Sequence, residues 1–109
     1  MAFGAVPADT PEKVFNLSIV RHAVPPQQRL IRVKKGDAVR LRVTSDVPGE
    51  LHLHGYRLEA KVAPGNPSEL AFRAYATGRY PLEWHAADDA GTSRPHHVPT
   101  LANLEVRPD

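Results

Sequence analysis

The chain has 109 residues, no cysteine and a formal net charge of +2 at pH 7. Without cysteine, disulfides, thiolate zinc sites and iron–sulfur clusters are excluded, and so small a net charge gives no argument for a nucleic-acid partner. Hydrophobic residues make up 41% of the chain and there are 11 prolines, which is typical of one turn-rich globular domain without a membrane span.

The N-terminal residues 1–12, rich in alanine and proline, are expected to form a flexible arm before a single domain over residues 13–109. The first twenty residues lack a basic start followed by an apolar run. A cytosolic chain and a mature exported chain would both look like this. Residues 14–20 alternate and predict a half-buried strand. His22 follows just before two prolines and is expected to be a loop residue rather than a ligand.

Two more alternating strands are predicted at residues 30–34 and 38–45, on either side of the turn signal Lys35-Gly36-Asp37. Their apolar residues occupy one set of positions and their basic residues the other. The basic set comprises Arg32, Lys34, Arg40 and Arg42. A solvated sheet face accounts for this pattern, and a docking face for an acidic partner is the alternative.

The segment Glu50-Leu51-His52-Leu53-His54-Gly55-Tyr56 follows the turn signal Pro48-Gly49. In an extended strand, the i, i+2 spacing puts His52 and His54 on one face and the two leucines on the other. Even spacing of apolar residues predicts that this strand runs on to Val62. Imidazole is a common ligand for copper and zinc, and a strand holds two imidazoles rigidly. The segment therefore predicts a metal-binding module.

The remaining strands are predicted at residues 70–74, 79–85 and 101–106. A polar loop over residues 86–100 carries Asp88-Asp89, expected to form a solvated acidic turn, and the pair His96-His97. About seven short strands, turns every 8–12 residues and no helical period predict an all-β, antiparallel β-sandwich.

Five of the six histidines lie in three segments that a sandwich could bring to one end. These candidate metal ligands are His52, His54, His85, His96 and His97. The chain has no Ser-His-acid constellation, P-loop, dinucleotide fingerprint or HExxH motif. The pattern therefore favours metal binding over catalysis.

From Ile31 onward, the order of motifs resembles the cupredoxins, including the copper-binding domains of cytochrome oxidase subunit II, nitrous oxide reductase and small blue copper proteins. The motifs are D-x-P-x-x-x-x-x-H-G-Y-x-L, V-x-P-G, F-x-A-x-x-x-G-x-Y and a closing L-x-V strand. The resemblance covers roughly residues 15–106 and implies a Greek-key, cupredoxin-like sandwich. In that family a blue-copper cysteine stands where this chain has Trp84, and the only methionine here is Met1. A blue, electron-transferring site is therefore not expected.

The stretch from Leu51 to Gly55 is also similar to the H-P-x-H-L-H-G motif of multicopper oxidases, and Glu83-Trp84-His85 falls where those enzymes carry H-C-H. The resemblance places the two lost blue-copper positions at Gly49 and Trp84, whereas His52, His54 and His85 remain.

Two geometries stay open for a metal site. In the inner one, His54 acts with His96 or His97. In the outer one, His52, His54 and His85 act together, and the loop histidines are an extra ligand source. The outer geometry is preferred, because alternation puts His85 on the opposite face from the bulky Trp84.

The expected function is a copper-binding cupredoxin-like protein with an all-histidine, non-blue site, in copper binding, delivery or tolerance, with zinc as a competitor. The resemblance implies a periplasmic or otherwise extracytoplasmic location. The expected partners are the metal ion, a copper-handling protein and a second copy in a metal-linked homo-oligomer. A metal-free cupredoxin-like interaction domain and a zinc or type-2 copper enzyme are the alternatives.

Overall fold

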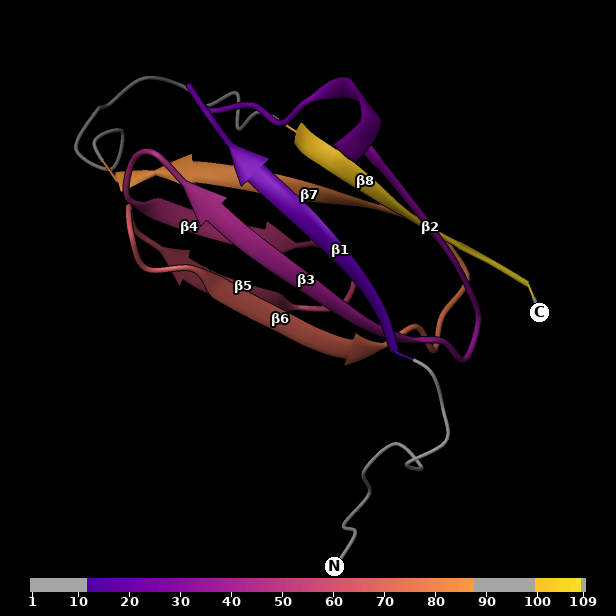
Figure 1. The fold of residues 1–109 in the computed structure, drawn as a ribbon. Coiled ribbons are helices and arrows are strands. Elements are labelled where there is room, and N and C mark those ends of the chain that lie inside the picture. The colour runs from indigo at the N-terminus through magenta and orange to yellow at the C-terminus, as the bar shows by residue number, and fades with distance from the viewer. Residues whose placement is uncertain (1–11, 88–99, 109) are drawn as a thin grey trace, which may run out of the picture.

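The computed structural model describes residues 12–87 and 100–108 (Figure 1). Of the predicted N-terminal arm, only Glu12 is described, and it belongs to the first strand. The strands and the short 3-10 helix, in chain order, are β1 (Glu12–Ile19), η1 (Pro26–Gln28), β2 (Leu30–Lys34), β3 (Ala38–Ser45), β4 (Gly49–Leu53), β5 (Leu58–Val62), β6 (Ser68–Arg73), β7 (Gly78–Ala86) and β8 (Thr100–Arg107). Within these residues, no helix is long and apolar enough to cross a membrane.

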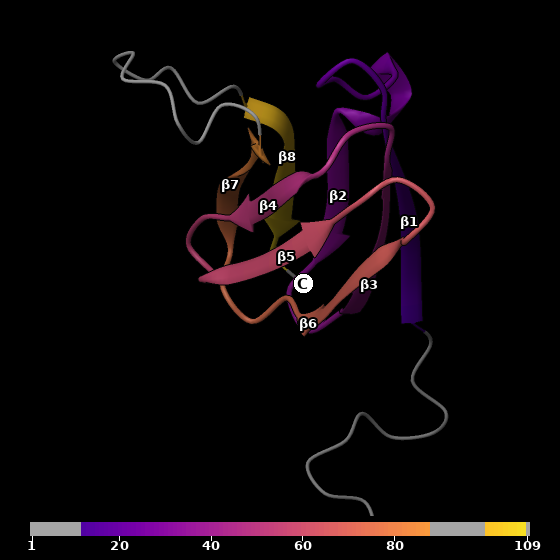
Figure 2. The ribbon, with the colours of Figure 1, turned by 90° about the vertical axis from the view of Figure 1, so that its left-hand side faces the viewer.

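The strands form two facing sheets, so the predicted β-sandwich is confirmed (Figure 2). One sheet has the order β1-β3-β6 and the other the order β2-β8-β7-β4-β5. The predicted antiparallel pairing holds for most neighbours, but β1 pairs with β3 and β2 with β8 in parallel. Both parallel pairs are at the edge of a sheet. Alternation within a strand decides which face is buried and carries no information on the direction of its neighbour.

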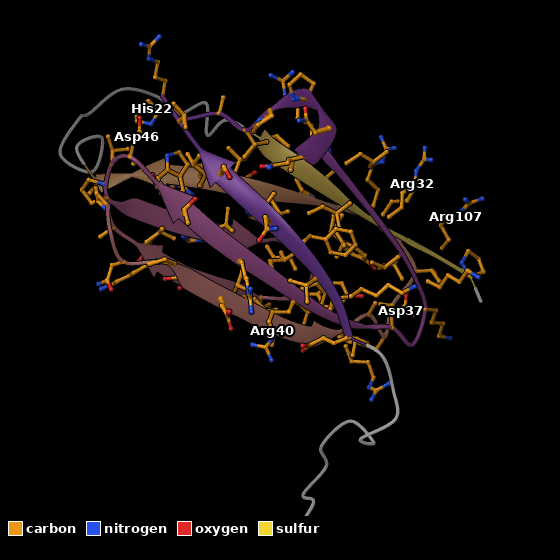
Figure 3. All side chains as sticks on the ribbon, viewed as in Figure 1. His22, Arg32, Asp37, Arg40, Asp46 and Arg107 are labelled. Carbon is orange, nitrogen blue, oxygen red and sulfur yellow. The ribbon has the colours of Figure 1, made fainter. Side chains whose placement is uncertain are left out.

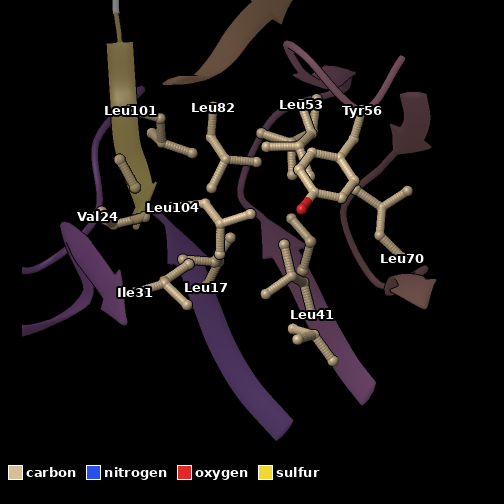
Figure 4. Close-up of a cluster of buried hydrophobic side chains, with 14 of the residues drawn as sticks. Leu17, Val24, Ile31, Leu41, Leu53, Tyr56, Leu70, Leu82, Leu101 and Leu104 are labelled. Carbon is tan, nitrogen blue, oxygen red and sulfur yellow. The ribbon is translucent and has the colours of Figure 1, made fainter. Parts of the chain in front are cut away.

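The core lies between the sheets and is built from alternate residues of nearly every strand (Figure 4). Leu17 of β1, Leu41 of β3, Leu53 of β4 and Leu104 of β8 are each at most 1% exposed. Burying one such side chain contributes about 1.5–3 kcal/mol. Since these residues point inward, their neighbours in each strand point to the outer faces.

The prediction of one continuous strand from Glu50 to Val62 is wrong, because a turn over residues 54–57 separates β4 from β5. Gly55 has a φ of +87°, and a Cβ added there would lie 2.3 Å from Cδ1 of Tyr80. Arg57 also has a left-handed backbone, with a φ of 55°. The even spacing of apolar residues continues through the turn, which hides it in the sequence. The resulting hairpin places His52 directly opposite Glu59.

Tyr56 of this turn is the centre of an aromatic cluster. Its ring centroid lies 5.3 Å from that of Phe72 and 4.9 Å from that of Tyr80. Its hydroxyl donates to the Ala76 carbonyl at 2.9 Å and accepts from the Ala76 N–H at 3.1 Å. Burial raises the pKa of Tyr56. The H-G-Y and F-x-A-x-x-x-G-x-Y motifs therefore meet in one place and hold the hairpin against β6 and the start of β7.

Candidate metal site

The outer face of β4, β5 and β7 carries two cross-strand rows of polar residues. Leu51 and Trp84 point into the core at 0% and 1% exposure, so the residues on either side of them in sequence face outward. Strand register aligns the outward residues in the rows Glu59–His52–Glu83 and Lys61–Glu50–His85. Imidazoles and carboxylates therefore alternate on this surface.

His52 and His85 lie side by side in this arrangement. Their ring centroids are 4.5 Å apart and the rings are tilted by 49°. Two imidazoles bound at right angles to one ion, as in a tetragonal Cu(II) site, have centroids about 4.5 Å apart, since each nitrogen lies about 2.0–2.1 Å from the metal and each ring centre roughly 3.2 Å from it. The spacing of this pair therefore suits two ligands of one ion.

Two carboxylates hold the ring of His52. Nε2 of His52 lies 3.2 Å from Oε1 of Glu50, and Nδ1 lies 3.5 Å from Oε2 of Glu59. A carboxylate beside an imidazole fixes the orientation of the ring. Because both nitrogens of His52 face carboxylates, one of the two contacts has to open before the ring can bind a metal. Sequence reasoning missed both. The i, i+2 spacing of Glu50 and His52 was a usable signal, whereas Glu59 became a neighbour only through the unpredicted turn.

His54 lies just beyond β4 and contacts a different carboxylate. Its Nε2 is 2.7 Å from Oε1 of Glu83, and its side chain is 51% exposed, against 25% for His52. Among residues 12–87 and 100–108, no three His, Cys, Asp or Glu side chains are grouped in a way that could hold a metal ion. The structure thus brings His52 and His85 together and leaves His54 with Glu83.

The predicted loop ligands His96 and His97, and the acidic pair Asp88-Asp89, lie outside the described residues. The chemistry of the described donors fits copper or zinc, because neutral imidazole with nearby carboxylate is a ligand set that both ions accept. His54 would have to leave Glu83 to join the other two imidazoles.

The opposite face of β7 holds Trp84, which the resemblance places at the lost cysteine position. A Cβ added to Gly49 would lie 2.5 Å from Cζ2 and 2.6 Å from Cη2 of the indole. The indole therefore occupies the space beside Gly49, the other lost position. Its N–H donates to Nδ1 of His22 at 3.3 Å. Glycine at position 49 and tryptophan at position 84 are therefore complementary in size, and the buried indole N–H has an acceptor.

His22 is a loop residue, as predicted, and its ring contacts the buried Trp84. It shares a tight turn with Arg21, and both have left-handed backbones, with φ of 66° and 53°. The carboxylate of Asp46 accepts the Arg21 N–H at 3.1 Å (Figure 3). With Nδ1 accepting from Trp84, the neutral ring carries its proton on Nε2 and has no free lone pair for a metal.

A shallow groove between β1 and β2 lies along the edge of the sandwich. It is lined by Val14, Phe15, Asn16, Leu17, Gln27, Gln28, Leu30 and Ile31. None of these side chains is titratable or a usual metal ligand. The chemistry of the described residues is thus concentrated on the outer face of β4, β5 and β7.

No protein-family model and no curated protein matches the sequence. Solved structures do match. A chain of a heme-copper terminal oxidase dimer is 16% identical with a TM-score of 0.63, over 87% of this chain and 65% of that one. The blue copper oxidase from Nitrosomonas europaea is 20% identical with a TM-score of 0.61, over 90% of this chain and 39% of that one. A copper binding protein in its apo form is 13% identical with a TM-score of 0.60, over 88% of both chains.

The chain spans 65% of the first of these neighbours and 39% of the second. At identities of 13–20%, the likeness concerns the fold and not the activity. Together with the two-sheet architecture, it shows that this chain is a cupredoxin-like β-sandwich.

Proposed function

We propose that this domain binds copper through histidine alone, in a non-blue site on the outer face of β4 and β7, and serves copper binding, delivery or tolerance. The observation that carries the proposal is the pairing of His52 with His85 at a centroid distance of 4.5 Å. His54 would supply a third imidazole by turning away from Glu83. His96 and His97 would be further ligands.

The chemistry of the chain sets the character of such a site. A blue, electron-transferring centre needs a thiolate, and the chain has no cysteine. Imidazole ligation suits Cu(II), and zinc competes for the same donors. Glu50 and Glu59 lie 3.2 and 3.5 Å from the two nitrogens of His52. One of them would give up its nitrogen to the ion, and the other would hold the ring in place. We propose a location in the periplasm or elsewhere outside the cytoplasm, and a copper-handling protein as partner.

One observation favours a second candidate, a metal-free interaction domain. His52 and His54 both have carboxylate partners already, so neither imidazole needs a metal to complete its contacts. Metal content of protein purified without added metal, followed by titration of the stripped protein with Cu(II) and with Zn(II), separates the two candidates.

The test uses three single variants and one double variant in isothermal titration. His52→Ala and His85→Ala should each weaken Cu(II) binding by about 10-fold or more. His22→Ala is the matched control, because it removes a histidine that contacts Trp84 on the other face. Electron paramagnetic resonance should show the wide copper hyperfine splitting of a nitrogen and oxygen site without blue colour. Unchanged affinity in the His52/His85 double variant would refute the site.

A further inference from the structure

The outer face of the five-stranded sheet has a second charged region, at the end opposite to the imidazoles. Four cations gather there, at register positions set by β2, β7 and β8. This basic quartet consists of Arg32, Lys34, Arg79 and Arg107. Register places Arg32 and Arg79 on either side of Glu105, and Lys34 directly opposite Arg107. Arg32 and Arg107 both project from the β2 end of the molecule (Figure 3).

The charges of the quartet are not balanced by its neighbours. Glu105 serves two guanidinium groups, with Arg32 at 3.0 Å and Arg79 at 3.9 Å. Within residues 12–87 and 100–108, no acidic side chain lies within 4.0 Å of the charged groups of Lys34 or Arg107. Like charges directly opposite each other in a sheet are destabilising. Among the described residues, Glu105 is thus the one carboxylate within ion-pair distance of the four exposed cations, while Asp37 accepts the backbone N–H of Lys34 and attracts its charge from farther away.

The basic residues on the outer face of the other sheet are arranged differently. Arg40 lies 3.0 Å from Glu12 and 2.6 Å from Glu69, and Arg42 lies 3.0 Å from the second oxygen of Glu69. These two arginines thus have two carboxylates between them, Glu12 and the shared Glu69. The prediction of a solvated face therefore suits the basic residues of β3, whereas the outer face of β2 and β8 carries an excess of positive charge.

We propose that the basic quartet docks an acidic segment of a partner protein. Glu105 lies at the centre of the cations, and Glu83 and Glu50 follow on the same face. These carboxylates repel a uniformly charged polyanion such as nucleic acid or an anionic membrane surface. A protein segment can place its carboxylates over the cations and leave a gap over Glu105. Such complementarity governs orientation and association rate.

A second copy of the chain fits this role less well. Its outer face offers Glu50, Glu59 and Glu83, but these already contact imidazoles at 2.7–3.5 Å. Pairing them with the quartet would sacrifice those contacts. An external acidic segment has no such cost.

The basic quartet lies on the same face as the proposed copper site, so docking there would affect access to that site; this step rests on the proposed function. Arg79 and His85 point outward from the same strand, β7, and are six residues apart. At about 3.3 Å per residue, this is about 20 Å. A partner held at the quartet would reach the imidazole end of the same face. The quartet would thus orient a copper-handling partner for exchange at His52 and His85.

The test uses the metal-free full chain, so its result does not depend on copper binding. The probe is a fluorescent ten-residue peptide with three Glu at each end and four Gly between them, which leaves a gap for Glu105, titrated at 50 mM and 300 mM salt. We expect saturable binding at low salt that weakens at high salt. Arg107→Gln should weaken it about fivefold, and Lys34→Gln with Arg107→Gln by roughly twentyfold.

Arg42→Gln is the matched control, because it lowers the net charge equally on the opposite sheet; it should change the affinity less than twofold. Equal weakening by Arg42→Gln would mean attraction to net charge alone and overturn the proposal, as would no binding at 50 mM salt. A DNA duplex that binds more tightly than the peptide would overturn the choice of a protein partner. Self-association that Arg107→Gln abolishes would assign the quartet to a second copy instead. Circular dichroism melting confirms that each variant is folded.

Discussion

Replacing Gly49 by alanine is expected to destabilise the protein through the indole of Trp84. The added Cβ would lie 2.5 and 2.6 Å from two indole carbons and 2.7 Å from the His85 carbonyl oxygen. Non-bonded carbons prefer about 3.5–4.0 Å, so the ring or the strand has to move by about 1 Å. Overpacking of this kind costs about 1–3 kcal/mol. The buried ring, at 1% exposure, has little room to yield.

A double-mutant cycle with Trp84→Phe tests the cause. A phenyl ring lacks the two indole carbons that the new Cβ would strike, so the second change should relieve part of the first. We expect the double variant to be more stable than the sum of the single changes predicts, by about 1 kcal/mol or more. The clash with the His85 oxygen remains in both backgrounds, so the recovery should be partial.

Urea unfolding followed by circular dichroism measures all four proteins, because Trp84 is the only tryptophan and its fluorescence is lost in two of them. Additivity within about 0.5 kcal/mol would refute the view that the indole fills the space beside Gly49.

Three further predictions concern single groups. Asp37 accepts the Lys34 N–H at 2.8 Å, which lowers the pKa of Asp37, so Asp37→Asn should cost about 1 kcal/mol at pH 7. The difference in free energy of unfolding between the parent and Asp37→Asn should shrink as the pH falls below about 4, because protonation of Asp37 removes the stability that its carboxylate contributes. A difference that is constant with pH would contradict this. Burial raises the pKa of Tyr56, so the fold should lose stability above about pH 10, where the unfolded phenol ionises first. Tyr56→Phe should weaken this loss of stability at high pH. It should also cost about 1–2 kcal/mol at pH 7, since the Ala76 N–H loses its acceptor. Unfolding curves from pH 7 to 11 measure both effects, and equal pH slopes in the two proteins would count against the role of the Tyr56 phenol. Cu(II) should quench the fluorescence of Trp84 by binding to the adjacent His85, whereas zinc should not. Strong quenching by zinc would undermine the copper assignment.

The fold was predictable from the sequence because alternation is a local property. In β3, Val39, Leu41 and Val43 are each fully buried, and every second residue faces outward, as their spacing predicts. Pairing is not local. The parallel contact of β1 with β3 joins Leu17 to Val43, and no feature of either strand specifies it.

The candidate site was predictable in part for the same reason. Spacing alone predicted that His52 and Leu51 lie on opposite faces of one strand, and likewise His85 and Trp84. The distance between the two histidines depends on the register of β4 with β7, in which Glu50 faces His85. The contact of Glu59 with His52 depends on a hairpin that the apolar spacing concealed. Contacts across strands require the register, which is fixed by turns and packing rather than by either strand.

The buried indole bears on which face of β7 can hold a metal. Its N–H needs an acceptor, and His22 supplies one from a turn with two non-glycine residues in left-handed conformation, which costs about 1–2 kcal/mol per residue. Asp46 holds that turn through the Arg21 N–H. An ion at the inner position would have to displace the indole, break its hydrogen bond and open the core. On the outer face, His85 needs no change in the core to bind, because its side chain already points away from it. The energetic cost of a metal therefore differs between the two faces of one strand, and this difference supports the outer geometry that we propose.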